Sequence, residues 1–414
     1  MLATGDVMSE EFFKIRRLPP YVFAAVNAMK ARARGVGEDI IDFGMGNPDF
    51  PTPAHIVDKL TETVHDPRTH RYSESRGIKG LRRALAGYYE RRFGVSVDPE
   101  TEVVVTLGSK EGLANLASAI SSPGDVILVP NPSYPIHQFG FIIAGAAVRN
   151  IPVRADGAFL SALERAVQHS VPKPTAIVLN YPNNPTAELA TLDFYGQVVD
   201  FCRHAGIYVM SDVAYAEIYF DGNPPPSILQ VPGAKEICVE FTSMSKTYSM
   251  PGWRIGFACG NARLIAALAR VKSYLDYGAF TPVQVAATAA LNGPQECVPQ
   301  MRERYKQRRD VLVAGLAAAG WEVPSPAATM FAWAPLPPAF KHLGSLEFSK
   351  LLLREAKVAV APGIGFGEHG DGYVRFAMVE NRHRTRQAIR NIKTFLGRYH
   401  NVVELAEKRA FGAE

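Results

Sequence analysis

Lys246 stands in a segment whose residue types suit covalent chemistry. Small hydroxyl residues (Ser243, Ser245 and Thr247) surround it, and Arg254 follows just before a short apolar run. A lysine amine can condense with an aldehyde, and hydroxyl donors with a guanidinium fork can hold a phosphate. Pyridoxal 5′-phosphate carries both groups. The alternative for the lysine alone is an exposed residue in a polar turn, and the whole cluster argues against it.

Two other polar groups each follow a short apolar run that predicts a buried strand. Asp212 comes after one run, with Tyr215 three residues later, and Asn184 lies in an Asn-Asn-Pro segment after another. A carboxylate at the end of a buried strand is costly unless it is paired, and a protonated pyridine nitrogen is a suitable partner. Asn184 and Tyr215 could reach an oxygen on the same ring. The alternatives are that Asp212 caps a helix and that the asparagines only form a turn.

Two more motifs could hold other parts of such a ligand. Gly108, Ser109 and Lys110 follow an apolar run and open a segment with helical spacing, where free N–H groups and the helix dipole attract a phosphate. A Gly-Ser pair is also a common helix cap. Tyr134 lies between two prolines in an extended loop, which suits its ring for stacking on a flat cofactor. The alternative for Tyr134 is a packed loop aromatic.

The elements that must position these residues alternate along the chain from about Pro53. The apolar runs are short and rich in β-branched residues, as strands buried on both faces are. They span residues 102–107, 126–129, 147–151, 175–180, 207–211, 237–242 and 255–259, with helices expected at 110–121, 159–168 and 194–204. This alternation predicts an α/β domain with a mainly parallel sheet covered on both faces. Ligands bind outside the carboxyl ends of such strands, where the polar motifs fall.

The pattern changes after a helical stretch at 282–318. We expect residues 330–334, 357–361 and 372–377 to be strands of a smaller α+β unit, with helices at 22–34, 346–355 and 383–398. We therefore expect three segments. Residues 1–52 form an N-terminal arm and part of the small domain, residues 53–295 form the large domain, and residues 296–414 form the rest of the small domain.

Composition narrows the class of protein. The 414 residues are 47% hydrophobic and 21% charged with a net charge of +5, which is ordinary for a globular chain and gives little reason to expect nucleic acid. Four scattered cysteines indicate reduced thiols, and the histidines show no metal-ligand spacing, so we expect no metal. The first residues lack the features of a signal peptide and no apolar run could span a bilayer. We expect a cytoplasmic protein with no membrane partner.

Taken in order, these motifs resemble the class I/II aminotransferases, which are pyridoxal-phosphate enzymes of fold type I. The resemblance covers essentially the whole chain and follows the family's site order: Gly108-Ser109-Lys110, Tyr134, Asn184, Asp212-x-x-Tyr215, Ser243-x-x-Lys246, Arg254 and Arg375. It implies an α/β large domain with a mainly parallel seven-stranded sheet, a smaller α+β domain, and a homodimer with composite active sites. One departure is Ala187, where much of the family has glycine.

The resemblance also implies a role for each residue. Lys246 would bond the cofactor and then move the proton at the substrate Cα. Asp212 would pair with the ring nitrogen. Asn184 and Tyr215 would hold the O3′ oxygen, and Tyr134 would stack on the face of the ring. The phosphate would be bound by Gly108, Ser109, Lys110, Ser243 and Arg254, and Tyr72 would reach the phosphate of the neighbouring subunit. The substrate would be bound by Arg375, which clamps the α-carboxylate, with Gly46 and Asn184 beside it.

Finer features point to one branch of the family. The Gly-Ser-Lys-Glu-Gly motif at 108–112 resembles the branch of alanine and LL-diaminopimelate aminotransferases, and stretches at 17–23, 272–278 and 361–367 look most like bacterial glutamate–pyruvate (alanine) aminotransferases. We expect amino-acid and 2-oxo-acid substrates, with L-alanine and 2-oxoglutarate giving pyruvate and L-glutamate. The alternatives are an LL-diaminopimelate or aspartate aminotransferase, or a carbon–sulfur lyase or cyclopropane-forming synthase on the same cofactor site. A transcription regulator is disfavoured, because no helix-turn-helix is recognisable before the large domain.

Overall fold

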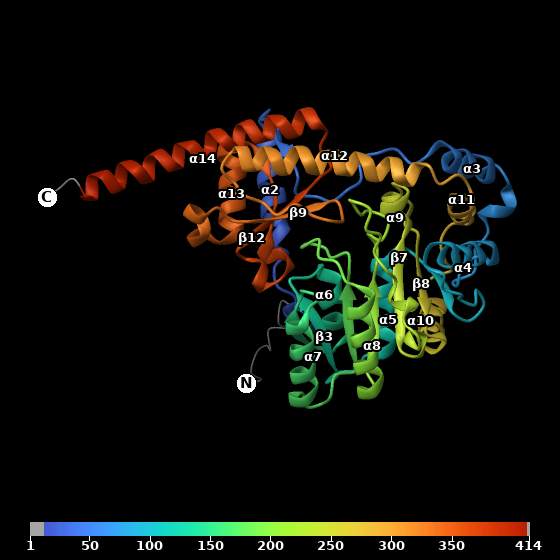
Figure 1. Cartoon of the computed structure of the whole chain (residues 1–414). Helices are drawn as coiled ribbons and strands as arrows, with labels where there is room; N and C mark the ends of the chain where they lie inside the picture. Colours follow the sequence, from blue (N-terminus) through green and yellow to red (C-terminus); the bar gives the residue numbers. More distant parts are fainter. Residues whose placement is uncertain (1–11, 412–414) are drawn as a thin grey trace, which may run out of the picture.

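A seven-stranded sheet forms the centre of the larger of two bodies in the computed structural model, which describes residues 12–411 (Figure 1). Its strand order is β2-β8-β7-β6-β5-β3-β4, and every neighbouring pair is parallel except the two pairs that involve β8. The strands are β2 (Val103–Thr106), β3 (Val126–Asn131), β4 (Ala147–Pro152), β5 (Ala176–Asn180), β6 (Tyr208–Asp212), β7 (Cys238–Ser243) and β8 (Gly256–Gly260). The predicted mainly parallel seven-stranded sheet is confirmed.

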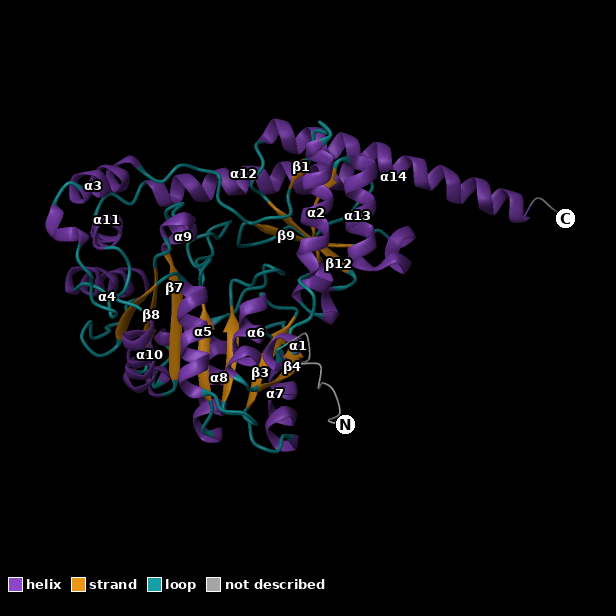
Figure 2. Cartoon of the chain, turned by 180° about the vertical axis from the view of Figure 1, so that it is seen from behind, coloured by secondary structure: helices purple, strands orange, loops and turns teal. Residues whose placement is uncertain are grey.

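Helices cover both faces of this sheet, because successive apolar residues of each strand point to opposite sides. Val105 and Leu128 belong to the core on one face, and their neighbours Val104 and Ile127 belong to the core on the other. The first face is covered by α4 (Lys79–Phe93), α7 (Gly157–His169) and α8 (Leu192–Ala205). The second face is covered by α5 (Ser109–Ile120), α6 (Pro135–Ala144) and α10 (Ala262–Leu275). Figures 1 and 2 view the molecule from opposite sides.

The smaller body combines the arm near the amino terminus with the carboxyl-terminal segment. From the arm come α2 (Val22–Gly35) and β1 (Ile41–Asp42), and β1 pairs in parallel with β10 (Val358–Ala359). The short helix α1 (Phe13–Arg16) lies beside β4 of the larger body (Figure 2), and Arg17 after it donates to the carbonyls of Gly145 and Ala146. An antiparallel sheet is formed by β9 (Phe331–Pro335), β11 (Ala361–Pro362) and β12 (Tyr373–Ala377). The helices around it are α12 (Cys297–Ala318), α13 (Gly344–Ala356) and α14 (Arg382–Phe411). Trp321, Phe348 and Phe376 lie in its core.

Two expected elements of this region are wrong. The strand predicted at 357–361 is two short strands, because Val360 separates β10 from β11 and each pairs in a different sheet. The helical stretch predicted at 282–318 is α11 (Thr281–Asn292) followed by α12, with a break at Gly293 and Pro294. The first of these helices packs against α3 (Ala54–Val64) and α4 in the larger body. Apolar periodicity continued through both breaks, so it did not locate them.

Helix α12 connects the two bodies. Val298 near its start belongs to the core of the larger body, whereas Tyr305 and Leu312 belong to the core of the smaller one. The domain boundary at 295/296 therefore stays a prediction that falls close to the start of this helix. No helix between residues 12 and 411 combines the length and the apolarity needed to cross a membrane. The expectation about the first residues and a signal peptide falls outside the described residues.

Candidate active site

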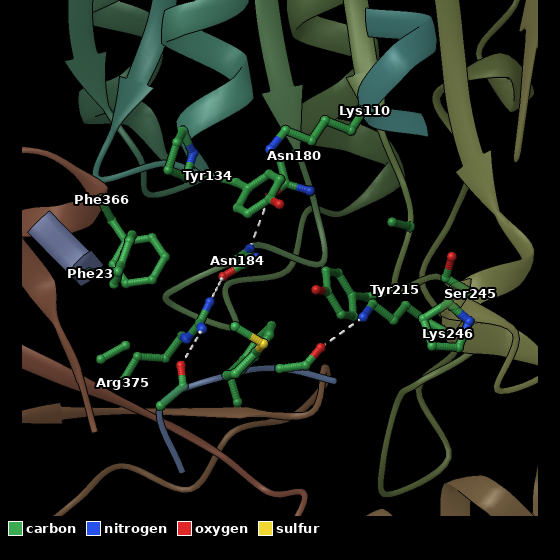
Figure 3. Close-up of a pocket in the computed structure, with 18 of the residues that line it drawn as sticks. Phe23, Lys110, Tyr134, Asn180, Asn184, Tyr215, Ser245, Lys246, Phe366 and Arg375 are labelled. Atoms are coloured by element: carbon green, nitrogen blue, oxygen red, sulfur yellow. Dashed lines mark hydrogen bonds between the residues drawn. The ribbon is translucent and has the colours of Figure 1, made fainter. Parts of the chain in front are cut away.

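A cavity of about 360 Å³ lies where the carboxyl ends of the sheet strands face the smaller body (Figure 3). Most of the residues singled out from the sequence line it: Gly46, Gly108, Ser109, Lys110, Tyr134, Asn184, Asp212, Tyr215, Ser243, Lys246, Arg254 and Arg375. Tyr72 does not line it. Parallel strands end at the same edge of a sheet, which is why motifs far apart in the chain meet here.

One end of the cavity is suited to an anion. Ser109 begins α5, so its first N–H groups are free of helical partners. Arg254 has a left-handed backbone (φ 54°), and its guanidinium donates to the carbonyls of Pro251 and Leu107 at 2.8 and 3.2 Å. A Cβ at Gly108 would lie 2.5 Å from Nη2 of Arg254, so glycine is required for this close approach. The N–H groups at the start of α5 and the guanidinium of Arg254 therefore face the same end of the cavity.

Lys246 is held between the two bodies by the short helix α9 (Met244–Thr247). Ser243 caps this helix, because its hydroxyl accepts the N–H of Ser245 at 3.1 Å. Nζ of Lys246 donates to the carbonyl of Gly46 at 2.8 Å. Burial, together with the positive charges of Arg375 and Arg254, lowers the pKa of Lys246 to about 8. The neutral, nucleophilic form of the amine is therefore a minor fraction near neutral pH, but a larger one than for an exposed lysine.

Asp212 is a buried carboxylate with a partner that the sequence did not reveal. Nε2 of His137 in α6 lies 2.9 Å from Oδ2 of Asp212, and both side chains are buried. The other carboxylate oxygen accepts the N–H of Ala214 at 3.1 Å. Asp212 caps no α-helix, because the chain continues as turns up to the helical turn η2 (Ile228–Gln230). His137 follows Tyr134 by three positions, but nothing in that spacing identified it as the partner of Asp212.

Asn180 is a second residue that sequence reasoning missed. It ends β5 directly opposite Asp212 on β6, and its amide donates to the carbonyl of Asp212 at 2.7 Å. Its Oδ1 accepts the N–H of Asn184 at 2.9 Å. This contact positions the turn that carries Asn184 at the cavity (Figure 3).

Arg375 extends from β12 across the gap between the two bodies. Its Nη1 donates to Oδ1 of Asn184 at 2.6 Å and its Nη2 donates to the carbonyl of Gly44 at 3.2 Å. The guanidinium lies over the rings of Phe331 and Phe366, with centroids 4.0 and 4.6 Å away. Burial lowers its pKa to about 10, so it stays charged at neutral pH. Its buried Nε has no hydrogen-bond partner among the described residues.

The expectation that Gly46 lies beside Arg375 needs refining. The contact with Arg375 comes from Gly44, whereas the carbonyl of Gly46 accepts from Lys246. A Cβ at Gly46 would lie 2.6 Å from the ring of Phe331, so glycine is required where the chain passes this ring. The sequence motif at 44–49 indicated this segment but not which carbonyl meets which cation.

Aromatic side chains complete the walls. Tyr134 and Tyr215 come from the larger body, and Phe331 packs edge-on against Tyr215 with centroids 5.4 Å apart. Phe23 of α2 packs against Phe366, centroids 5.2 Å apart, and both cover the cavity on the side of Arg375 (Figure 3). The two phenylalanines were not predicted, because no local pattern distinguishes them from core residues.

Tyr72 lies on the outer surface. It is 86% exposed, and its ring packs against Tyr277 with centroids 4.7 Å apart. Within residues 12–411, no group of three or more His, Cys, Asp or Glu side chains could hold a metal ion. The arrangement as a whole places an amine with a lowered pKa in one cavity with an anion site, a second cation and a buried carboxylate.

Comparison with known proteins agrees with this geometry. The sequence matches the family "Aminotransferase class I and II" over residues 38–392. It is 66% identical over 404 residues to the provisionally named aminotransferase AatC of Rhizobium meliloti (strain 1021), with 97% of this chain and 100% of that protein covered. It is 56% identical over 382 residues to the glutamate-pyruvate aminotransferase AlaC of Escherichia coli (strain K12), with 92% and 93% covered.

A more distant relative and a solved structure give the same result. The LL-diaminopimelate aminotransferase of Moorella thermoacetica is 44% identical over 389 residues, with 94% of this chain and 99% of that protein covered. A substrate-bound structure of BacF from Bacillus subtilis superposes with a TM-score of 0.89 at 35% identity, covering 94% of this chain and 98% of that one. The chain therefore belongs to the class I and II aminotransferase family, enzymes of fold type I that transfer amino groups.

Proposed function

We propose that this enzyme binds pyridoxal 5′-phosphate in the cavity and transfers the amino group of L-alanine to 2-oxoglutarate. The observation that carries the cofactor proposal is the position of Lys246. It lines the same cavity as an anion end, formed by Ser109 and Arg254, and as the carboxylate of Asp212. The donor set fits the group, because a phosphate, an aldehyde and a protonated ring nitrogen each have a suitable partner. The absence of a Cβ at Gly108 leaves the anion end open.

The residues of this chain divide the work of the reaction. Bound pyridoxal phosphate supplies an aldehyde that captures amino groups and a ring that accepts electron density. Lys246 would bond the aldehyde and would also be the group that moves the proton at the substrate Cα. Asp212, itself oriented by His137, would pair with the ring nitrogen and favour its protonated form. Asn184 and Tyr215 would hold the O3′ oxygen, and Tyr134 would contact the ring.

Arg375 is the proposed clamp for the substrate α-carboxylate. A guanidinium binds a carboxylate through two parallel hydrogen bonds, and the unpartnered Nε of Arg375 is a free donor for one of them. The surrounding rings of Phe23 and Phe366 exclude water, which strengthens this interaction. Asn184 already contacts the guanidinium and orients it.

The choice of alanine and glutamate rests on the relatives. The glutamate-pyruvate aminotransferase AlaC is more similar to this chain than the LL-diaminopimelate aminotransferase of Moorella thermoacetica, at 56% against 44% identity. Of the described residues that line the cavity, the arginines are Arg254 and Arg375, so a long substrate finds no further guanidinium there. LL-diaminopimelate is the second candidate donor because relatives with that activity cover most of this chain.

Kinetics with a panel of substrates test this proposal. The donors are alanine, glutamate, aspartate and LL-diaminopimelate, each measured with pyruvate or 2-oxoglutarate as the acceptor. We expect alanine and glutamate to give the highest kcat/KM. If LL-diaminopimelate or aspartate exceeds both by about tenfold, which is about 1.4 kcal/mol in transition-state binding, the substrate assignment is wrong. Ammonia release without a 2-oxo acid would instead indicate a carbon–sulfur lyase.

We also propose that the active unit is a cytoplasmic homodimer with composite sites. The exposed ring of Tyr72 supports this, because its hydroxyl would serve the phosphate bound by the neighbouring subunit. Mixing Tyr72→Phe with Lys246→Ala under subunit exchange forms heterodimers with one doubly defective site and one intact site. Activity should then exceed the sum of the two parents. Unchanged activity despite proven exchange would contradict the composite site.

A further inference from the structure

Lys272 is a buried cation outside the cavity that the proposed chemistry does not use. It lies in α10 and is 0% exposed. Its Nζ contacts Oε1 of Glu111 at 3.0 Å and Oδ2 of Asp276 at 2.9 Å. Burying an ammonium is costly unless it is paired, and even a paired one is weak evidence for stability. The informative feature is therefore what its two partners hold in place.

The first partner leads to the anion end of the cavity. Glu111 lies in the first turn of α5, just after Lys110. Its Oε2 accepts the N–H of Leu107 at 2.8 Å, and the carbonyl of Leu107 accepts from Nη2 of Arg254 at 3.2 Å. Lys272 thus holds the carboxylate that bonds the N–H of Leu107, the residue whose carbonyl accepts from Arg254.

The second partner leads to the surface of the molecule. Oδ1 of Asp276 accepts the N–H of Gly278 at 2.6 Å, and the carbonyl of Asp276 accepts from the hydroxyl of Ser75. Gly278 has φ 80°, and a Cβ there would lie 2.3 Å from the carbonyl oxygen of Glu74. These contacts hold the segment 276–278 closely against the segment 74–75.

Both segments carry exposed aromatic rings next to these contacts. Tyr72 is 86% exposed and packs against Tyr277, which is 61% exposed. Exposed aromatic groups of this size mark contact surfaces, and the proposed function assigns Tyr72 to the contact with a second copy of the chain. A single lysine therefore lies between the anion end and the surface expected to meet the other subunit.

We infer that Lys272 is a positioning residue that couples cofactor binding at the anion end to association of the chain with a second copy. The inference rests on the proposed function, because it takes pyridoxal phosphate as the anion and the homodimer as the assembly. Coupling between two binding events is reciprocal, so the cofactor should tighten the dimer by the same factor by which the dimer tightens the cofactor.

The test compares purified apoenzyme variants by two measurements other than activity. Fluorescence titration gives the affinity for pyridoxal phosphate, and analytical ultracentrifugation gives the dimer dissociation constant with and without cofactor. Lys272→Met should weaken cofactor binding by about tenfold or more, equivalent to about 1.4 kcal/mol, and cofactor should tighten the dimer less than it does in the parent. Lys272→Arg keeps the charge with a different shape and should recover part of both effects. The control is Lys59→Met, which removes a lysine from an exposed pair with Glu62.

A second variant keeps the test decisive if Lys272→Met does not fold. Glu111→Ala leaves Lys272 paired with Asp276 but removes the acceptor for the Leu107 N–H, so it should weaken cofactor binding as well. The inference is overturned if the variants that fold bind cofactor within twofold of the parent, or if cofactor tightens their dimer as it does in the parent. A parent chain that fails to bind pyridoxal phosphate would instead overturn the proposed function, which separates the two failures.

Discussion

The two walls of the cavity are built in different ways. The wall from the larger body consists of residues at or just beyond the carboxyl ends of neighbouring strands, and its buried carboxylate Asp212 pairs within that wall with His137. The wall from the smaller body is assembled from distant segments, since Arg375 rests on the carbonyl of Gly44, 331 positions away. We expect substitutions in the first wall to damage the chemistry and substitutions in the second to damage substrate recognition.

The largest effect should come from Lys246 in the first wall. Lys246→Ala removes both the amine that bonds the cofactor and the group that moves the proton, so kcat should fall by about three orders of magnitude or more. The fold should survive, as checked by circular dichroism. Borohydride reduction followed by mass spectrometry should place the cofactor on Lys246 in the parent and find no covalent adduct in the variant. A reduced adduct on another lysine of the parent, or a covalent adduct in the variant, would rule out Lys246.

The corresponding change in the second wall is Arg375→Ala. Leaving one partner of a buried charged pair alone costs roughly 2–5 kcal/mol, so kcat/KM should fall by about 1.5 to 4 decades for every amino acid. Arg375→Lys keeps the charge but loses the fork and should recover only part. The order of preference among donors should stay the same, because Arg375 binds the group that all of them share. A changed order would mean that this wall also recognises the side chain.

Asp212→Asn, also in the first wall, should lower kcat by less than Lys246→Ala does. The ring nitrogen loses its anionic partner, and removing one such electrostatic contact costs on the order of 100-fold in kcat. Cofactor affinity, measured by titration, should change far less, because the phosphate and lysine contacts remain. A near-normal kcat would mean that Asp212 only orders the turn at Ala214.

The smallest expected effect is on the pKa of Lys246 in the first wall, which depends on the charge of Arg375 in the second wall. Because the pKa of Lys246 is lowered to about 8, its amine is mostly protonated below that pH and mostly free above it. The rate at which the apoenzyme bonds added pyridoxal phosphate should therefore rise with pH and level off above about pH 8. Arg375→Met removes a positive neighbour and should move this midpoint to higher pH. A midpoint that stays in place would mean that the charge of Arg375 does not lower this pKa.

Local pattern predicted the strands of the first wall and several polar residues at their ends, but neither Asn180 nor His137. Short apolar runs predicted the strands to within about two residues, because buried strands need continuous apolar sequence. In a mainly parallel sheet the strand ends meet at one edge, so the clusters around Asn184, Asp212 and Lys246 could be expected to lie together. The resemblance to a known family then supplied Arg375, which no periodicity pointed to.

The sequence by itself therefore determined the sheet, the chemical groups at its edge and the kind of ligand that they suit. Only the tertiary structure decided which groups meet. It paired Asp212 with His137, set the carbonyls of Gly44 and Gly46 against different cations, and enclosed Lys272 between Glu111 and Asp276. The physical reason is that strand and helix periodicity reports which face of an element is buried. It carries no information on the register between elements, and that register determines each of these contacts.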